Sequence, residues 1–183
     1  MWVFAKLSRL SQIQVLAVII KTNSMTQVRL MTESDSLELS QVIKEVIQDI
    51  PYYNDLAKSN EIKKFSASAL ADKIREDKYS AIVATENKKI IGFCLSRFDD
   101  YLIWLEWFGI LKNQRGKRIS KLLLEELEKT THLRGCHKIW CDCRTTNEAS
   151  KHILSAFGYQ QIATVSNHWY GQDFILWQKL LAK

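Results

Sequence analysis

A basic turn between an apolar strand and an amphipathic helix is the segment of this sequence best suited to bind phosphate. It runs Ile110-Leu-Lys-Asn-Gln-Arg-Gly-Lys-Arg-Ile-Ser-Lys-Leu-Leu-Leu124. The first N–H groups of a helix have no acceptor within that helix, and they carry the positive end of its dipole. The lysines and arginines of the turn add to this positive charge. The segment therefore predicts a binding site for a phosphate-bearing cofactor.

Cysteines and histidines gather near one part of the chain and raise the question of a metal site. The residues concerned are Cys94, Cys136, Cys141, Cys143, His132 and His137. Structural zinc sites usually draw their ligands from closely spaced cysteine pairs, and no paired CxxC motif is present here. We therefore predict no metal. Four cysteines in a chain of 183 residues do not indicate a disulfide scaffold, so we expect a reduced, cytoplasmic protein.

The hydrophobic pattern predicts which elements position these residues. Strands are expected at residues 26–32, 79–85, 89–98, 101–111, 138–144, 159–165 and 169–180. Helices are expected at residues 39–50, 62–74, 119–134 and 148–157, with Asp35 as the cap of the first and Pro51 after its end. The fold class is therefore α/β (α+β), a single domain in which about four helices flank a mixed central sheet of about seven strands.

Composition supports one folded domain preceded by an extension. The chain is 46% apolar and 25% charged, with one proline and six glycines, as in ordinary globular proteins. Residues 1–24 contain Lys6, Arg9 and Lys21 but no acid, and their apolar run is too short for a membrane span. We interpret them as an N-terminal extension of a domain of residues 25–183. That domain is only weakly basic, so we expect neither nucleic-acid nor membrane binding.

Two motifs about thirty residues apart match the pattern of a known family. The first is Gln/Arg-x-x-Gly-x-Gly/Ala, and residues 115–120 occupy it, five residues after the aliphatic Ile110. The second starts at an asparagine and ends in Gly-Phe, and it corresponds to Asn147, Ser150, Gly158 and Tyr159. With the same element order over residues 26–182, the chain resembles the GNAT superfamily of acetyl-CoA-dependent N-acetyltransferases.

The resemblance implies a GNAT-like domain with a defined site for acetyl-CoA as co-substrate. In this family the backbone of the fourth strand pairs with the pantetheine arm, and the turn after it holds the pyrophosphate. The residues implied to bind the cofactor are Phe108, Gly109, Ile110, Arg115, Gly116, Lys117, Arg118, Ile119, Ser120, Lys121 and Asn147. A homodimer is also common in the family.

Three positions depart from the family pattern. Arg118 and Ser120 stand where the family has small residues. Arg118 can still offer its N–H to phosphate if its φ is negative, as at a helix start, and Ser120 can hydrogen-bond phosphate. Leu154 stands seven residues after the motif asparagine, where many members have a tyrosine that protonates the leaving thiolate. Water, the solvated thiolate or another side chain must then serve, and Tyr170 is a candidate by residue type alone.

An amine attacks a thioester only when it is neutral, so the implied reaction needs a base. Glu106 is the first candidate, because it would share a strand face with Ile110 and its apolar neighbours would disfavour the charged form. Asp142 is the second, because some family members carry a catalytic glutamate five residues before the motif asparagine. Cys143 as a covalent nucleophile is less favoured, since the usual mechanism of the family is direct attack.

These features together predict an N-acetyltransferase that moves an acetyl group from acetyl-CoA to a primary amine. The acceptor would be a small molecule or a protein amine, with a slight preference for a cation suggested by Asp99, Asp100 and Glu106. A non-catalytic acyl-CoA-binding or regulatory module of the same fold is the alternative, motivated by Leu154 and the missing glycines. A basic nucleic-acid-binding protein is a third reading, and salt-sensitive binding would reveal it.

Overall fold

The computed structural model describes residues 26–181, so the extension predicted over residues 1–24 lies outside the described part. The strands are β1 (Gln27–Leu30), β2 (Ala81–Glu86), β3 (Lys89–Asp99), β4 (Leu102–Ile110), β5 (Lys138–Arg144), β6 (Gln160–Val165) and β7 (Phe174–Leu180). The α-helices are α2 (Ser36–Gln48), α3 (Asp55–Lys64), α4 (Ala67–Glu76), α5 (Ile119–Leu133) and α6 (Glu148–Ala156). Short 3-10 turns are η1 (Glu33–Asp35), η2 (Lys112–Gln114) and η3 (Trp169–Gly171).

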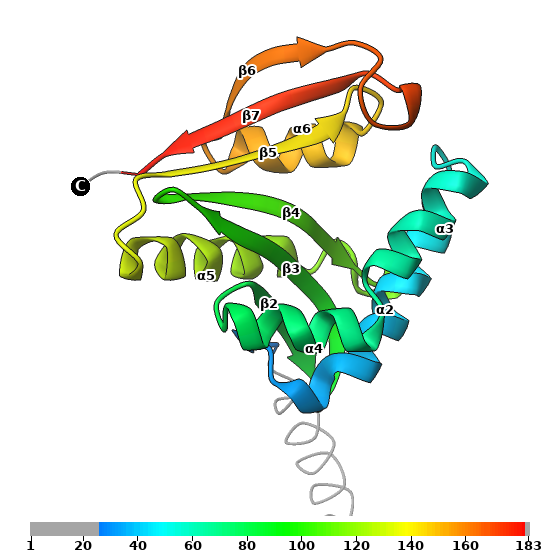
Figure 1. Ribbon diagram of the computed structural model, residues 1–183, viewed down its shortest axis with the longest axis vertical. Helices are drawn as coiled ribbons and strands as arrows, with labels where there is room; N and C mark the ends of the chain where they lie inside the picture. Colours follow the sequence, from blue (N-terminus) through cyan, green and yellow to red (C-terminus); the bar gives the residue numbers. More distant parts are fainter. Residues whose placement is uncertain (1–25, 182–183) are drawn as a thin grey trace, which may run out of the picture.

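The strands form one mixed seven-stranded sheet in the order β1-β2-β3-β4-β5-β7-β6. Neighbours pair antiparallel except β4 and β5, which pair parallel. Helix α5 lies against one face of β1 to β5, and α2 and α4 lie on the opposite side (Figure 1). The predicted fold class is thereby confirmed, with five α-helices in the described residues where about four were expected.

Apolar patterning places a hydrophobic core on each face of the sheet. On one side α2 contributes Leu39, Ile43 and Ile47, which are fully buried against β2 and β3. On the other side Leu123 and Leu127 of α5 pack against strands that include β2, β4 and β5. Full burial of such a side chain contributes roughly 1.5–3 kcal/mol. These two cores fix β4 and α5, the two elements that the phosphate hypothesis needs.

Two details of the first helices differ from the predictions. The helix expected over residues 62–74 is two helices, because Phe65 leaves the helical conformation and Ser66 caps α4 by accepting the N–H of Ala69. The predicted cap position of α2 is confirmed at Asp35, but the Asp35 side chain does not cap that helix. Its carboxylate accepts the backbone N–H of Thr32 at 2.8 Å, so the chain turns through η1 before α2 begins. Side-chain caps of this kind compete with continued helix.

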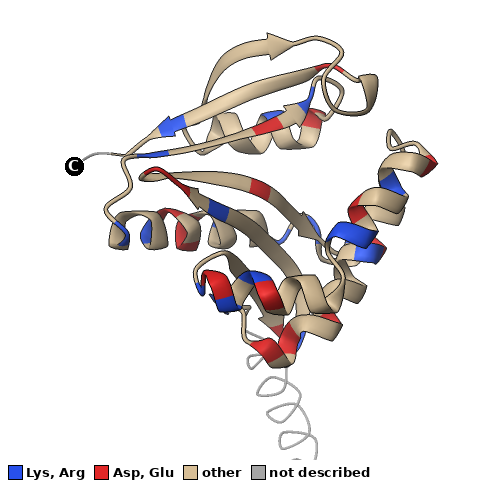
Figure 2. Cartoon of the chain, viewed as in Figure 1, with Lys and Arg blue, Asp and Glu red and all other residues tan. Residues whose placement is uncertain are grey.

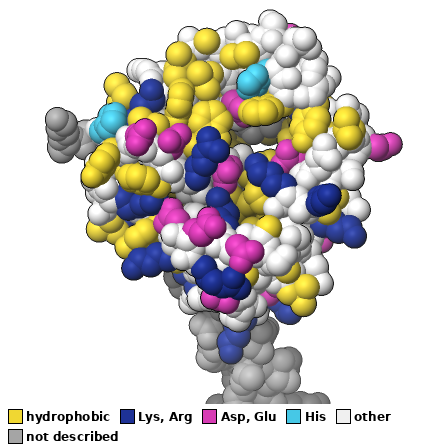
Figure 3. Space-filling view, viewed as in Figure 1, with side chains coloured by type: hydrophobic (Ala, Val, Ile, Leu, Met, Phe, Trp, Pro, Cys, Tyr) yellow, Lys and Arg dark blue, Asp and Glu magenta, His cyan; other side chains and the backbone are white. Residues whose placement is uncertain are grey.

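Charge is distributed without a dominant sign. Lysines, arginines and acidic residues are interspersed along α3, α4 and α5 (Figure 2), and the face seen in Figure 3 mixes both signs with hydrophobic side chains. No continuous basic surface, the feature expected of a nucleic-acid-binding protein, is visible among the described residues on that face. Within residues 26–181, no cluster of three potential metal ligands occurs, and no helix is long and apolar enough to cross a membrane.

Candidate active site

A cavity opens where β4 and β5 separate. The two strands pair from Leu102 and Lys138 up to Leu105 and Cys141, and the described chain has no pairing between them beyond that point. Figure 1 shows them side by side at one end and diverging towards the other. The cavity has a volume of about 660 Å³. Of the predicted site residues it is lined by Glu106, Phe108, Gly109, Ile110, Arg115, Gly116, Arg118, Ile119, Ser120, Asp142 and Asn147, whereas Lys117, Lys121 and Tyr170 lie outside its wall.

The start of α5 presents a row of free backbone donors to this cavity. Within the described chain, the N–H groups of residues 116–120 have no hydrogen-bond acceptor, and no side chain caps the helix. Gly116 and Arg118 have positive φ values of 81° and 62°, and such a turn gathers successive N–H groups around a concave site for an anion. The dipole of the fifteen-residue helix α5 adds positive potential at the same place.

Arg118 does not have the negative φ under which we expected its N–H to be available to phosphate. The residue is left-handed at the cap of α5, and its side chain is exposed. A residue with a Cβ pays roughly 1–2 kcal/mol for this conformation, whereas glycine adopts it freely. The family glycine at this position thus has a backbone reason, and the arginine carries strain that its sequence alone did not reveal.

Replacing Arg118 with glycine is expected to raise the free energy of unfolding by about 0.5–1 kcal/mol, because the relief of strain exceeds the extra entropy of glycine in the unfolded chain. Chemical denaturation measures this change. Gly116→Ala is the matched control with the opposite sign. Its added Cβ meets no atom within 4 Å, so any loss of stability reports backbone strain alone. Destabilisation by Arg118→Gly would contradict the strain argument.

The cations of the turn are not equivalent. Arg115 pairs with Asp49 at 2.9 Å, and Lys112 pairs with the other oxygen of that carboxylate at 2.9 Å. These two cations lower the pKa of Asp49. Lys117 donates to Gln114, and Lys121 lies 3.5 Å from Glu125 on the surface of α5. Arg115 and Arg118 are the cations of this segment that line the cavity, and Asp49, also in the wall, partly offsets the charge of Arg115.

The backbone of β4 forms the other side of the cofactor region. From residue 106 onward its edge towards β5 is unpaired in the described structure. Close packing holds this edge in place, since a Cβ added to Gly109 would come within 2.7 Å of the Phe93 ring and 2.9 Å of Val46. Glycine at this position therefore lets β4 approach α2. The backbone N–H and C=O groups of Phe108 and Ile110, which alternate with those that pair with β3, are on the unpaired edge that faces the cavity.

Glu106 lies at a β-bulge, which changes the side it faces. On β3, Leu95 pairs with Trp107 and Ser96 with Leu105, so Glu106 is an extra residue in β4. Its carboxylate accepts a hydrogen bond from Lys73 of α4 at 2.6 Å, whereas Ile110 packs on the α5 side. The expectation that Glu106 and Ile110 share one face is thus wrong, because a bulge shifts the alternation by one residue. The neighbours of Glu106 in the sequence are apolar, but in the folded protein Lys73 provides a counter-charge for its carboxylate.

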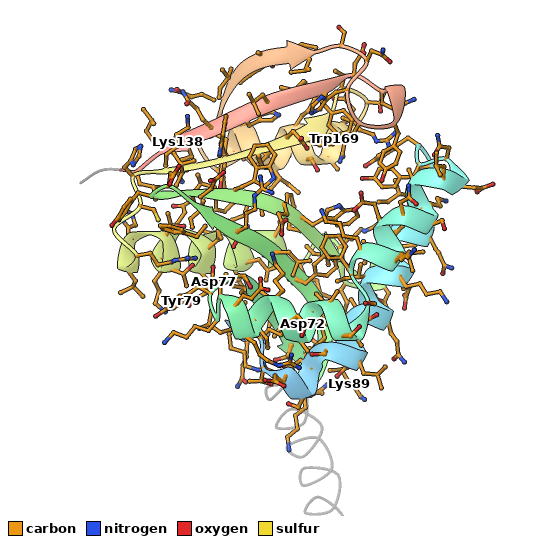
Figure 4. All side chains as sticks on the ribbon, in the orientation of Figure 1. Asp72, Asp77, Tyr79, Lys89, Lys138 and Trp169 are labelled. Carbon is orange, nitrogen blue, oxygen red and sulfur yellow. The ribbon has the colours of Figure 1, made fainter. Side chains whose placement is uncertain are left out.

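Asp142 is the carboxylate of the cavity that has no cationic partner. It forms no ion pair within residues 26–181, and its Oδ2 accepts the indole N–H of Trp169 at 3.0 Å. Burial raises the pKa of Asp142, and this hydrogen bond partly opposes the rise. A carboxyl group with a raised pKa is better matched to accept a proton near neutral pH. Figure 4 shows Trp169 near the end of β5 where the two strands separate.

Replacing Trp169 with phenylalanine is expected to move the acid limb of the pH–rate profile upward by about 0.5 pH unit. The substitution removes the donor that stabilises ionised Asp142 while retaining an aromatic ring, so the pKa of the carboxyl rises further. Measuring kcat from acid to neutral pH tests this. Trp104→Phe is the control, because Trp104 packs against Trp140 and lies outside the cavity wall. If the acid limb does not move in Trp169→Phe, the group whose titration sets that limb is not the carboxyl group that Trp169 contacts.

The remaining candidates lie in different surroundings. Tyr170 was predicted on the last strand but lies in η3, where its hydroxyl donates a hydrogen bond to Glu61 at 3.2 Å. Leu154 is buried in the cavity wall. Burial raises the pKa of the Cys143 thiol to about 11, which suits a buried thiol better than a nucleophile. Asn147 caps α6 by accepting the N–H of Ser150 at 3.1 Å.

Sequence reasoning missed three charged residues of the cavity wall, Asp49, Arg144 and Glu148, of which Asp49 and Glu148 form ion pairs. Arg144, at the end of β5, is only 4% exposed and contacts the loop between α2 and α3. That loop brings Tyr52 and Tyr53 to the wall. The available signal was the alternation of β5, which places Arg144 two residues after Asp142 and therefore on the same face.

Comparison with known proteins agrees with this geometry. Residues 43–159 match the model of the acetyltransferase (GNAT) family. The chain belongs to this family. An acetyltransferase of Pectobacterium atrosepticum is 27% identical over 94 residues, which cover 51% of this chain and 67% of that protein. The family predicted from the motifs is thus confirmed, and membership supports acetyl transfer in general terms.

Solved GNAT structures share the fold. The PaiA N-acetyltransferase of Thermoplasma acidophilum, in complex with coenzyme A, superposes with a TM-score of 0.77 at 19% identity, over 86% of this chain and 99% of that one. An acetyltransferase of Salmonella typhimurium, determined with acetyl-CoA, gives a TM-score of 0.69 at 18% identity, over 86% and 95%. At these identities the likeness is one of fold.

Proposed function

We propose that this GNAT protein is an N-acetyltransferase that uses acetyl-CoA and acetylates a primary amine by direct attack. The observation that carries the proposal is that one cavity contains three things together: the free N–H groups at the start of α5, the unpaired edge of β4, and Asp142 without a counter-charge. An anion site, a backbone edge and a base are the parts that the reaction requires.

The residues present fit acetyl-CoA. The N–H groups of residues 116–120 would hold its pyrophosphate, with Arg115 and Arg118 adding positive charge. The free edge of β4, from Phe108 to Ile110, would pair with the pantetheine arm and orient the thioester. Coenzyme A and acetyl-CoA in the solved relatives support this assignment. The thioester supplies an activated acetyl group when bound.

In the proposed reaction the amine nitrogen forms a bond to the thioester carbon and the C–S bond breaks. Asp142 accepts the proton that the amine loses, directly or through water. Free N–H groups of β4 stabilise the negative charge that develops on the acetyl oxygen. Leu154 supplies no proton and Tyr170 lies outside the cavity wall. The proposal assigns protonation of the departing thiolate to water. Glu106, paired with Lys73, is the competing candidate for the base.

Two measurements made on the same preparation test this function. Direct binding of acetyl-CoA is measured first, and thiol release is then followed with a broad panel of primary amines. The proposal expects both binding and amine-dependent turnover. Binding without turnover of any amine would favour the non-catalytic acyl-CoA-binding module, for which the buried Leu154 in the place of the family tyrosine is the specific observation.

A further inference from the structure

Arg144 is a buried cation without a counter-ion. Its Nη1 donates to the carbonyl oxygen of Tyr52 at 3.0 Å, while its Nε is buried and has no acceptor. Within residues 26–181, Arg144 takes part in none of the ion pairs. Arginine is seldom buried to this extent unless an anion accompanies it. One backbone carbonyl uses only part of a group that has five donors.

Aromatic rings surround this guanidinium. Its carbon lies 4.2 Å from the ring centre of Tyr53, 5.6 Å from that of Phe174 and 5.9 Å from that of Tyr52. Ring faces attract a cation but accept no directed hydrogen bond to a guanidinium edge. The cage therefore holds Arg144 in a fixed orientation and excludes water, and it leaves the charge without a paired oxyanion.

Arg144 also lies beside the proposed base. Residues 142 and 144 are on the same face of β5, where they pair with Leu176 and Phe174 of β7 without a bulge, and their Cα atoms are about 7 Å apart by strand geometry. Both line the cavity. One wall of the cavity thus presents a carboxylate and a guanidinium side by side on the same face of one strand.

We propose that the acceptor is an amino acid whose carboxylate pairs with Arg144 while its amine faces Asp142. This inference rests on the proposed function and names the substrate class of that same site. A planar guanidinium binds a carboxylate through two parallel hydrogen bonds, and the surrounding rings strengthen the pair by excluding water. The carboxylate would supply the counter-ion that Arg144 lacks among the described residues.

Other uses of Arg144 fit the structure less well. The pyrophosphate already has the N–H groups of residues 116–120 at the start of α5, on a different element. The slight preference for a cationic acceptor loses its basis. Asp99 and Asp100 lie at the turn between β3 and β4, outside the cavity wall, and Glu106 is paired with Lys73. Arg144 also supports the loop between α2 and α3 through the Tyr52 carbonyl and the Tyr53 side chain, but neither contact supplies an anion for its charge.

A matched acceptor panel tests the inference on the unmodified protein. Each set contains a free amino acid, its amide and its decarboxylated amine, over aromatic, aliphatic, acidic and basic side chains. For at least one side chain, kcat/KM for the free acid should exceed that for both analogues by about tenfold or more. Amides or amines that are turned over equally well or better throughout would overturn the inference and leave acetyl transfer standing. Acetyl-CoA binding without any turnover would contradict both.

Substitution of Arg144 then separates recognition from loop support. Arg144→Met should reduce the acid-to-amide ratio to about one, and Arg144→Lys should retain part of it, with acetyl-CoA affinity within about twofold of the unmodified protein. A purely structural role would lower turnover of acid and amide alike and leave the ratio unchanged, which would also overturn the inference. Lys138→Met is the control, since Lys138 lies at the opposite end of β5, over Trp140 (Figure 4), and outside the cavity wall.

Discussion

Asp142→Asn is expected to lower kcat by about 10²- to 10⁴-fold, the usual contribution of a general base, while the Kd for acetyl-CoA stays nearly constant. The amide retains the size of the carboxyl group and can still face Trp169, so the loss would come from the proton acceptor itself. Steady-state turnover with a saturating amine and a separate binding titration give the two quantities.

The pH dependence of the same variant gives an independent test. Burial raises the pKa of Asp142, and a base works only when deprotonated, so activity of the unmodified protein should fall as the pH drops through that raised pKa. Asp142→Asn should lose this acid limb. Glu106→Gln is the competing variant, and it should retain the limb because its carboxylate is held by Lys73. If Glu106→Gln shows the larger loss and Asp142→Asn keeps the limb, the base is Glu106.

The elements of the site were predictable because their signals are local. The helical spacing of Ile119, Leu123 and Leu127 and the basic turn before it lie within one short segment, and each can be read without knowing the rest of the chain. The same holds for the alternation of side chains along β5, which puts Asp142 and Arg144 on the same face. Membership in the GNAT family followed from two such segments at a fixed separation.

The features that assign roles within the site were not local. Lys73 reaches Glu106 across 33 residues of sequence, and Arg144 reaches Tyr52 across 92, so no window of sequence contains either pair. The bulge at Glu106 depends on the register of β4 with β3. The positive φ of Arg118 is imposed by the folded turn, although residues other than glycine seldom adopt it. The order of the two base candidates, Glu106 and Asp142, changed because of the bulge at Glu106 and its pairing with Lys73.

Ser120→Asp is expected to weaken acetyl-CoA binding by about 10- to 100-fold, the size of a unit charge repulsion near a protein surface, while the fold becomes slightly more stable. Position 120 is the second residue of α5, whose first turn contains no acid. An aspartate there interacts favourably with the helix dipole, by about 0.3–1 kcal/mol. The same charge would repel a bound pyrophosphate, so stability and affinity should change in opposite directions.

Ser68→Asp provides the control for that experiment. Ser68 is the exposed second residue of α4, and the first turn of α4 also contains no acid. The substitution therefore offers the same gain from the helix dipole at a position outside the cavity wall. It should raise stability and leave the Kd for acetyl-CoA unchanged. If Ser120→Asp binds acetyl-CoA as tightly as Ser68→Asp does, the N–H groups at the start of α5 do not hold the pyrophosphate. The anion site would then have to be sought elsewhere in the cavity, with Arg144 as the remaining buried cation.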